Sequence, residues 1–407
     1  MAEVIVVGAG PVGMLLAAEL ARRGVDVEVV ERRGRSGDGS RAIGLHAPVL
    51  AALEGGGATD RILEHAVRVS RGEARSDGRL LGVVRFDRLP VRHPYVATLP
   101  QAHTEAALAV GAPTPRRGVA VSRVRPRGDR VTLETSGTGG ERELSAPIVV
   151  VAGGVGARDL VFRDGALRRT GYPDRYLMSD VDVPERADSD VAVVHLARSG
   201  VLESFPLPHG RRRFVAWDAG GGGGRAGGGG HAGGGGHADG GGPWHPDLDE
   251  AGARLDRLRT AMRERGEAEA AEALTEATGF RVRRVLAPAL RRGRLVVIGD
   301  SAHEISPIGG QGMNLGLLDA ATLAPLLADW IRTGTEPVAA LARWERDRLR
   351  SARAAGRLAA INMGLGRPVS RATHAARARS LGTVLAATGA LVPRAYAMGL
   401  DAAARTR

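Results

Sequence analysis

The sequence predicts an α/β fold with a discontinuous first domain, a second domain that contains its own sheet, and C-terminal helices. Three observations support this prediction. A glycine-rich turn joins a strand to a helix near the amino terminus, and a second glycine-rich turn follows a strand near residue 299. Short runs of strand composition lie between them, and the chain from about residue 312 onward is alanine-rich with a helical pattern.

The amino-terminal 31 residues predict a β-α-β unit. Residues 4–7 are β-branched, residues 11–23 are rich in alanine and leucine, and residues 25–30 return to strand composition. Gly24 is placed to end the helix. This order predicts a parallel crossover, which is the basic unit of a Rossmann-type sheet.

The turn of this unit carries the spacing GxGxxG, formed by Gly8, Gly10 and Gly13, and Glu31 ends the second strand. In such a turn the first glycine permits the tight bend, the second allows the backbone to approach a pyrophosphate, and the third allows close helix packing. The helix start offers N–H groups to the anion. Glu31 is expected to accept hydrogen bonds from ribose hydroxyls and to repel a 2'-phosphate, which favours FAD or NAD over NADP.

Strand composition returns in the middle of the chain, at residues 68–99, 119–151 and 172–217. The last of these is expected to belong to a separate sheet that faces a ligand. Residues 219–242 are almost entirely glycine, histidine and alanine, which predicts a flexible linker. His231 and His237 lie six residues apart there, but repetition of a six-residue unit explains their spacing better than a metal site does.

A polar helix is expected over residues 248–278, followed by a strand over 294–299. Asp300 lies where this strand ends, the position at which open α/β sheets contact their ligands. The turn from Ser306 to Gly312 has little side-chain bulk and leads into a helix that begins near Met313. Its glycines allow close approach to a flat ring, and the helix start favours an electron-rich edge such as that of a reduced flavin.

Composition excludes several kinds of chemistry. The chain of 407 residues has 57 basic and 45 acidic residues, a net charge of +12, and neither lysine nor cysteine. Schiff-base and Walker lysines, disulfides and thiolate metal sites are therefore excluded. The scattered arginines argue against nucleic-acid binding, and the apolar runs are too short for a membrane span. We expect a cytoplasmic protein without a bound metal.

These motifs, together with the segment SRAIGLH and the tripeptide Leu99 to Gln101, resemble the single-component FAD-dependent aromatic hydroxylases. That group is typified by p-hydroxybenzoate hydroxylase and actinobacterial polyketide monooxygenases. The resemblance covers most of residues 1–360. The residues expected to bind FAD are Gly8, Gly10, Gly13, Glu31, Arg32, Arg41, Gln101, Gly299, Asp300, Pro307, Gly309, Gly310, Gln311, Gly312, Met313 and Asn314. Arg41 and Gln101, taken alone, are explained equally well as a solvated charge and a helix cap.

The resemblance implies a division into three parts: an FAD-binding domain (1–67, 97–160 and 281–355), a substrate domain (68–96 and 161–280) and C-terminal helices (356–407). It also implies that NADH or NADPH reduces the flavin transiently and that oxygen then forms a flavin hydroperoxide, which hydroxylates a small aromatic or polyketide-derived substrate. No catalytic residue or oligomeric state is assigned. His46, His195 and His209 are candidate bases, and each is explained more simply as a structural or surface histidine.

Two departures from the family pattern keep alternatives open. Gly153 and Ala157 stand where the family has the aspartate and serine of a DGxxS motif, which serves FAD and the pyridine nucleotide together. The helix after Gln101 is expected to be short, because prolines follow it closely. The alternatives are an FAD-dependent reductase of the geranylgeranyl-reductase type and a degenerate, non-catalytic flavin binder.

Overall fold

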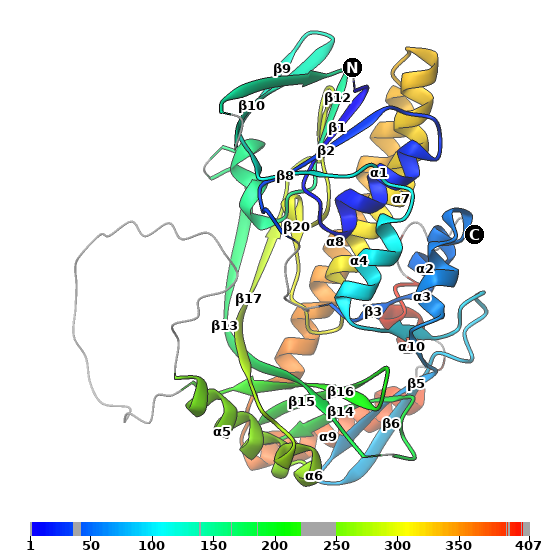
Figure 1. Cartoon of the computed structure of the whole chain (residues 1–407). Coiled ribbons are helices and arrows are strands. Elements are labelled where there is room, and N and C mark those ends of the chain that lie inside the picture. Colours follow the sequence, from blue (N-terminus) through cyan, green and yellow to red (C-terminus); the bar gives the residue numbers. More distant parts are fainter. Residues whose placement is uncertain are drawn as a thin grey trace.

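The architecture is that of a mixed α/β protein with two main sheets joined by long strands (Figure 1). The computed structural model describes residues 2–35, 42–137, 140–163, 165–184, 186–220, 250–387, 389, 391–399 and 401. Most of the predicted glycine-rich linker, including His231 and His237, lies outside the described residues. Arg41 also lies outside them.

A six-stranded sheet forms one end of the molecule, with the order β18-β19-β12-β1-β2-β8. All its neighbouring strands pair in parallel except β18 with β19. Strands β1 and β12 are buried along their whole length, as expected for parallel strands covered on both faces. The strands are β1 (Val4–Val7), β2 (Val27–Glu31), β8 (Arg116–Arg117), β12 (Ile148–Val151), β18 (Arg291–Arg292) and β19 (Leu295–Val297).

Helix α1 follows β1 and packs against α7, so the two glycine-rich turns are brought to one edge of this sheet. The predicted β-α-β unit is therefore present, with Gly24 in the left-handed region at φ +80°. The helices around this sheet are α1 (Pro11–Ala21), α2 (Ala47–Leu53), α3 (Ala58–Leu63), α4 (Gln101–Ala109), α7 (Gly312–Thr333) and α8 (Val338–Gly366). Short 3-10 segments are η1 (Glu54–Gly56), η2 (Val155–Leu160) and η4 (Gly299–Ser301).

An eight-stranded sheet forms the other end, with the order β20-β17-β13-β16-β15-β14-β5-β6. The long strands β13 and β17 reach from this sheet toward the first one (Figure 1). The strands are β5 (Arg71–Ser76), β6 (Arg79–Arg85), β13 (Arg168–Asp182), β14 (Val191–Ala197), β15 (Gly200–Leu207), β16 (Arg211–Asp218), β17 (Thr278–Leu286) and β20 (His303–Glu304). Strand β17 crosses the predicted domain boundary at residue 280, and the division into domains stays a prediction.

Two small sheets complete the fold. One has the order β11-β10-β9 and the other the order β3-β7-β4. Their strands are β3 (Gly44–Leu45), β4 (Val67–Val69), β7 (Val96–Thr98), β9 (Val119–Arg127), β10 (Arg130–Gly137) and β11 (Arg142–Ala146). The segment 68–99 therefore contributes to two sheets rather than one.

The helical expectations are correct in kind but differ in extent. The single helix expected over residues 248–278 is wrong: the structure has α5 (Ala251–Arg263) and α6 (Ala268–Glu272), because the chain turns at Gly266 with φ +81°. Helix α4 has only nine residues. The C-terminal part contains α8, α9 (Arg371–Ala387) and α10 (Leu391–Tyr396). Among the described residues, no helix is both long and apolar enough to cross a lipid bilayer.

Candidate functional site

The glycines of the first turn have different structural tasks. Gly8 has φ +113°, and a Cβ atom there would lie 2.6 Å from the backbone oxygen of Ala152. A Cβ on Gly13 would lie 2.0 Å from the backbone oxygen of Gly8. A Cβ on Gly10 would meet no atom within 4 Å. The fold itself therefore requires glycine at positions 8 and 13, whereas Gly10 borders open space that a ligand can approach.

The start of α1 is suited to an anion. The helix begins at Pro11 with Gly10 as its N-cap, and no side chain caps it. No acidic residue lies in its first turn. The free N–H groups and the positive end of the helix dipole therefore point into the open space beside Gly10.

Glu31, at the end of β2, reaches back to this turn. It accepts a hydrogen bond from the backbone N–H of Ala9 at 2.8 Å, and bonds from the backbone and side chain of Arg33 at 2.9 and 3.1 Å. Burial opposes ionisation, but these hydrogen bonds together lower the pKa of Glu31. The ionised carboxylate is thus held beside the turn, and its remaining lone pairs can accept from a ribose hydroxyl.

The second turn lies directly beside α1. Gly299 has φ +62°, and a Cβ there would lie 3.3 Å from the side chain of Val12. A Cβ on Gly316, in the second turn of α7, would lie 2.6 Å from Val12 and 3.0 Å from the Cα atom of Gly299. Close packing of α1, η4 and α7 therefore joins two motifs that are almost three hundred residues apart in sequence.

Asn314 fixes the segment 306–312 against the SRAIGLH segment. Its Oδ1 atom accepts from the backbone N–H of His46 at 2.9 Å, and its Nδ2 atom donates to the backbone oxygens of Gly44 and Gly310 at 2.8 and 2.9 Å. Gly309 and Gly310 have φ +94° and +68°. The side chain of Asn314 is thus committed to the protein, and the exposed Pro307 and the glycine backbone form the open surface of the turn.

His46 lies beneath this turn. Its side chain is fully buried, and its Nε2 atom lies 3.6 Å from the position of a Cβ on Gly310, so the ring faces the backbone of the turn. Burial lowers the pKa of His46 to about 4. Of the three candidate bases, only His46 adjoins the turn: His195 faces Glu267 at 3.4 Å, and His209 lies in an exposed turn with φ +62°.

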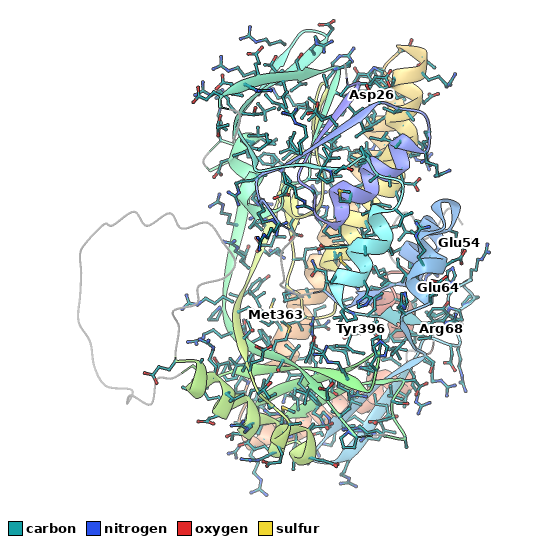
Figure 2. All side chains as sticks on the ribbon, in the orientation of Figure 1. Asp26, Glu54, Glu64, Arg68, Met363 and Tyr396 are labelled. Carbon is teal, nitrogen blue, oxygen red and sulfur yellow. The ribbon has the colours of Figure 1, made fainter. Side chains whose placement is uncertain are left out.

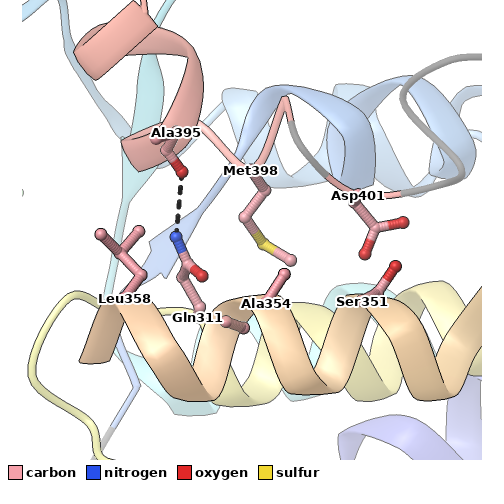
Figure 3. Close-up of a pocket in the computed structure, with 8 residues that line it drawn as sticks. Gln311, Ser351, Ala354, Leu358, Ala395, Met398 and Asp401 are labelled. Carbon is pink, nitrogen blue, oxygen red and sulfur yellow. Dashed lines mark hydrogen bonds between the residues drawn. The ribbon is translucent and has the colours of Figure 1, made fainter. Parts of the chain in front are cut away.

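The other expected site residues differ in their availability. Gln311 is buried, and its Nε2 atom donates to the backbone oxygen of Ala395 at 3.2 Å across a small cavity of about 30 Å³ (Figure 3). Gln101 begins α4, accepts from the backbone N–H of Ala42 at 3.3 Å and donates to Glu105 at 2.8 Å. Arg32 is exposed. Asp300 and the half-buried Gly312 and Met313 lie along the same edge, with the Asp300 side chain exposed.

The loop that replaces the DGxxS motif is compact. A Cβ on Gly153 would lie 2.6 Å from the Cβ of Ala157. Arg158, which is 4% exposed, donates to the backbone oxygen of Asp300 at 3.2 and 2.7 Å and pairs with Glu304 at 2.9 Å. Ser301 donates to the backbone oxygen of Gly154 at 2.9 Å. The loop is therefore held against η4 by Arg158 and Ser301, without a carboxylate at position 153.

A buried ion network behind the second turn was not foreseen from the sequence. Asp319 accepts from the backbone N–H of Gly299 at 3.0 Å, from His303 at 2.6 Å and from Arg348 at 2.7 Å. Arg348 also pairs with Asp401 at 2.8 Å. Burial opposes the charge on Asp319, but His303 and Arg348 together lower its pKa. A charged residue inside the apolar run LGLLDA was the available signal.

Within the ranges that the structure describes, no group of three or more histidine or acidic side chains is arranged to hold a metal ion. The assembled features are therefore an anion-binding helix start, a carboxylate for hydroxyl groups, and a flat glycine-rich surface. All three lie at the carboxyl edge of the six-stranded sheet.

Comparison with known proteins identifies relatives of this chain. A family model described as an FAD binding domain matches residues 1–202 and 245–359. The chain is similar to 6-methylpretetramide 4-monooxygenase of Streptomyces rimosus, with 33% identity over 345 residues, covering 81% of this chain and 56% of that protein. It is also similar to rifampicin monooxygenase of Rhodococcus hoagii, with 32% identity over 362 residues, covering 86% of this chain and 68% of that protein.

Solved structures show the same fold. A p-nitrophenol 4-monooxygenase from Pseudomonas putida DLL-E4 superposes with a TM-score of 0.80 at 24% identity, covering 98% of each chain. An aromatic hydroxylase from angucycline biosynthesis superposes with a TM-score of 0.73 at 25% identity, covering 98% of this chain and 76% of the other. Against two monooxygenases of tetracycline-type compounds, the chain spans 56% and 66% of their length.

Proposed function

Because this chain belongs to the family of FAD-dependent aromatic hydroxylases that share the FAD binding domain, we propose that it is itself a monooxygenase. The proposed reaction uses FAD, NADH or NADPH, and oxygen to hydroxylate a small aromatic or polyketide-derived substrate. The relatives named above are monooxygenases, which favours this function over a reductase of the geranylgeranyl-reductase type. The lack of cysteine is compatible with a cytoplasmic enzyme of this class.

One observation carries the proposal: the two glycine-rich turns, distant in sequence, lie at one edge of the parallel sheet. The contacts of Val12 with Gly299 and Gly316 hold them together. A cofactor with a pyrophosphate in its middle and a flat ring system at one end requires both surfaces at once. A single glycine-rich turn would not distinguish FAD from other nucleotides.

The residues present fit FAD. Open space beside Gly10 and the uncapped start of α1 suit the pyrophosphate, and Glu31 suits the adenosine ribose. The backbone of the 307–312 turn suits the flavin ring, and the buried ring of His46 lies close beneath it. When bound, FAD supplies the redox chemistry. The protein holds it, orients the substrate and excludes water.

The direct test is spectroscopic. We would purify the full chain, add excess FAD, remove the unbound FAD by gel filtration and record the visible spectrum of the protein. NADH or NADPH is then added without oxygen, and air is admitted last. A yellow protein that bleaches and recovers its colour supports a working flavin enzyme. Oxygen consumption coupled to a hydroxylated product from a panel of phenols then distinguishes the hydroxylase from the reductase. A protein that stays colourless with excess FAD would refute the proposal.

The compact 153–157 loop favours a second candidate, a flavin binder that pyridine nucleotides reduce poorly. Position 153 lacks both the carboxylate and the space for it. Reduction by dithionite as well as by NADH and NADPH separates the two candidates. A protein that binds FAD and is bleached by dithionite, but only very slowly by either nucleotide, is the second candidate.

A further inference from the structure

Glu203 is a buried acid on one face of the eight-stranded sheet. This face is turned toward the second glycine-rich turn, residues 306–312. Glu203 lies on β15, directly opposite Val194 of β14 and Val215 of β16, and Val215 in turn lies opposite Met178 of β13. Residues directly opposite one another in antiparallel strands point to the same face. Glu203 therefore shares a face with Val215 and Met178, and, two residues along β13, with Tyr176.

This face packs against α8 and the turn. Tyr176, Val201 and Val215 form one apolar cluster with Met363 of α8 and Ile308 of the turn. A Cβ on Gly366, near the end of α8, would lie 2.8 Å from the side chain of Val201. Met363 lies between the lower sheet and the upper half of the molecule (Figure 2). The face that carries Glu203 is thus the one that looks toward the proposed flavin surface.

Two further polar groups connect this face to the turn. The amide nitrogen of Asn362, on α8, lies 2.9 Å from the position of a Cβ on Gly309. The hydroxyl of Tyr396, from α10, donates to the Oδ1 atom of Asn362 at 2.6 Å. Figure 2 shows Tyr396 in the same layer as Met363. Residues from β13, β15, α8 and α10 therefore meet where the sheet packs against the turn.

Glu203 is the unpaired acid of this group. It is 8% exposed, and it makes no hydrogen bond or ion pair with the described residues. The charged groups nearby on the same face are paired: Asp174 with Arg367 at 2.6 Å, and Asp180 with Arg213 at 2.6 Å. The hydroxyl of Tyr176 is fully buried and also lacks a partner.

The protonation states agree with this placement. Burial alone raises the pKa of Glu203 to about 8. Burial and the charge of Glu203 raise the pKa of both Tyr176 and Tyr396. A buried carboxyl without a partner is costly to the fold, so a role in binding accounts for it better than a role in stability.

We propose that Glu203 binds the ring hydroxyl of the substrate and accepts its proton, while the hydroxyl of Tyr176 donates to the same oxygen. The substrate class is then a phenol. The phenol O–H bond breaks, a new O–H bond forms on the Glu203 carboxylate, and no electrons are transferred. The resulting phenolate is more electron-rich and therefore more reactive toward oxygen transfer. This inference rests on the proposed monooxygenase function.

The test uses 4-nitrophenol, whose phenolate form absorbs visible light and whose phenol form does not. After FAD uptake has been measured, the dye is titrated into the FAD-loaded full chain at pH 6 to 9. Since a protonated Glu203 donates to the phenolate and an ionised one repels it, the affinity calculated for the phenolate should fall about tenfold between pH 7 and pH 9. In Glu203→Gln, which cannot ionise, that affinity should not change over this range.

Two variants act as controls. Glu272→Gln, an exposed acid on α6, should keep the wild-type pH profile. Tyr176→Phe should weaken binding at every pH without abolishing the pH dependence. If Glu203→Gln has the wild-type profile, or if the FAD-loaded protein binds no phenol, the inference is overturned.

A readout that needs no flavin separates this inference from the proposed function. Because folding raises the pKa of Glu203, the stability that this group contributes is present at low pH and is lost as pH rises toward and past 8. The Tm of Glu203→Gln relative to wild type should therefore be higher at pH 9 than at pH 6. Equal differences at the two pH values would contradict the inference, whereas failure to bind FAD would count against the proposed function alone.

Discussion

Gly10→Ala should separate cofactor binding from folding. Gly10 has φ −80° and ψ 178°, a conformation that alanine adopts freely, and its Cβ would meet no atom within 4 Å. Alanine restricts the unfolded chain, which stabilises the fold by about 0.4–1 kcal/mol. It is a poorer N-cap than glycine, which costs about 0.5 kcal/mol. These effects offset each other, so the free energy of unfolding without FAD should stay within about 1 kcal/mol of wild type.

The same methyl group occupies the space through which the backbone must approach a pyrophosphate. At an FAD concentration one hundred times its Kd, FAD should stabilise the wild-type protein by about 2.7 kcal/mol. A tenfold loss of affinity reduces this to about 1.4 kcal/mol, and complete loss removes it. The assay is urea unfolding followed by circular dichroism, with and without FAD, together with a fluorescence titration of FAD.

Two other glycines provide matched controls. Gly252, in α5, also faces open space, so Gly252→Ala should leave the stabilisation by FAD unchanged. Gly13→Ala places a methyl carbon 2.0 Å from a backbone oxygen and should destabilise the protein itself by at least about 1–3 kcal/mol. The reasoning is refuted if Gly10→Ala binds FAD as tightly as wild type, or if it unfolds as readily as Gly13→Ala.

Three further predictions concern charge and space near the site. Asp319→Asn should destabilise the protein by about 3–5 kcal/mol in urea unfolding, because it breaks a fully buried ion pair, whereas the exposed Asp329→Asn should change stability by less than about 1 kcal/mol. Burial lowers the pKa of His46, so as pH falls this side chain takes up a proton in the unfolded chain but not in the folded one. Between pH 7 and pH 5 the free energy of unfolding of the wild type should therefore fall by about 2 kcal/mol more than that of His46→Asn. Equal falls in the two proteins would contradict this. Gly153→Asp alone should be destabilising, because its Cβ would lie 2.6 Å from that of Ala157. Gly153→Asp combined with Ala157→Gly should fold, and NADH or NADPH should reduce its flavin faster than that of the wild type in stopped-flow measurements. An unchanged rate in the folded double variant would show that this position does not limit reduction.

The parts of the fold that the sequence predicted are those in which local signals agree. In the first unit, an apolar strand, a GxGxxG turn and a glycine helix stop all indicate the same β-α-β crossover, and the structure has it. The prediction of one helix over 248–278 is wrong because helical composition continues through Gly266, where the chain turns. At the other end, Thr278 pairs with β13 as the first residue of a strand. Pairing partners far away in sequence decided that boundary, and composition does not record them.

The site divides in the same way. Glycine positions can be predicted from the sequence, because places where backbones approach each other closely leave no room for a Cβ atom. The direction in which a polar side chain points cannot be predicted in this way, since it depends on the neighbours of that side chain in space. Gln311 and Asn314 belong to the expected flavin-binding motif, yet their side chains bind the backbone of α10 and of the segment around Gly44. The charge of Glu203 inside the mostly apolar run VLESFPL is a weak signal of the kind that Asp319 also gives, and only its burial without a partner makes it notable.

The loop at Gly153 shows why binding of FAD and its reduction are separable properties of this chain. The Gly8 turn packs against Ala152 and Gly153, and Arg158 holds the rest of the loop on the backbone of Asp300. These contacts keep the edge of the sheet in shape without the missing aspartate. Arg158 therefore provides the structural part of what a DGxxS loop does, whereas nothing at position 153 provides its charge. It follows that loss of Arg158 should weaken FAD binding, measured by fluorescence titration. A carboxylate restored at position 153, with Ala157→Gly to make room for it, should change the rate of reduction and leave FAD binding as it is.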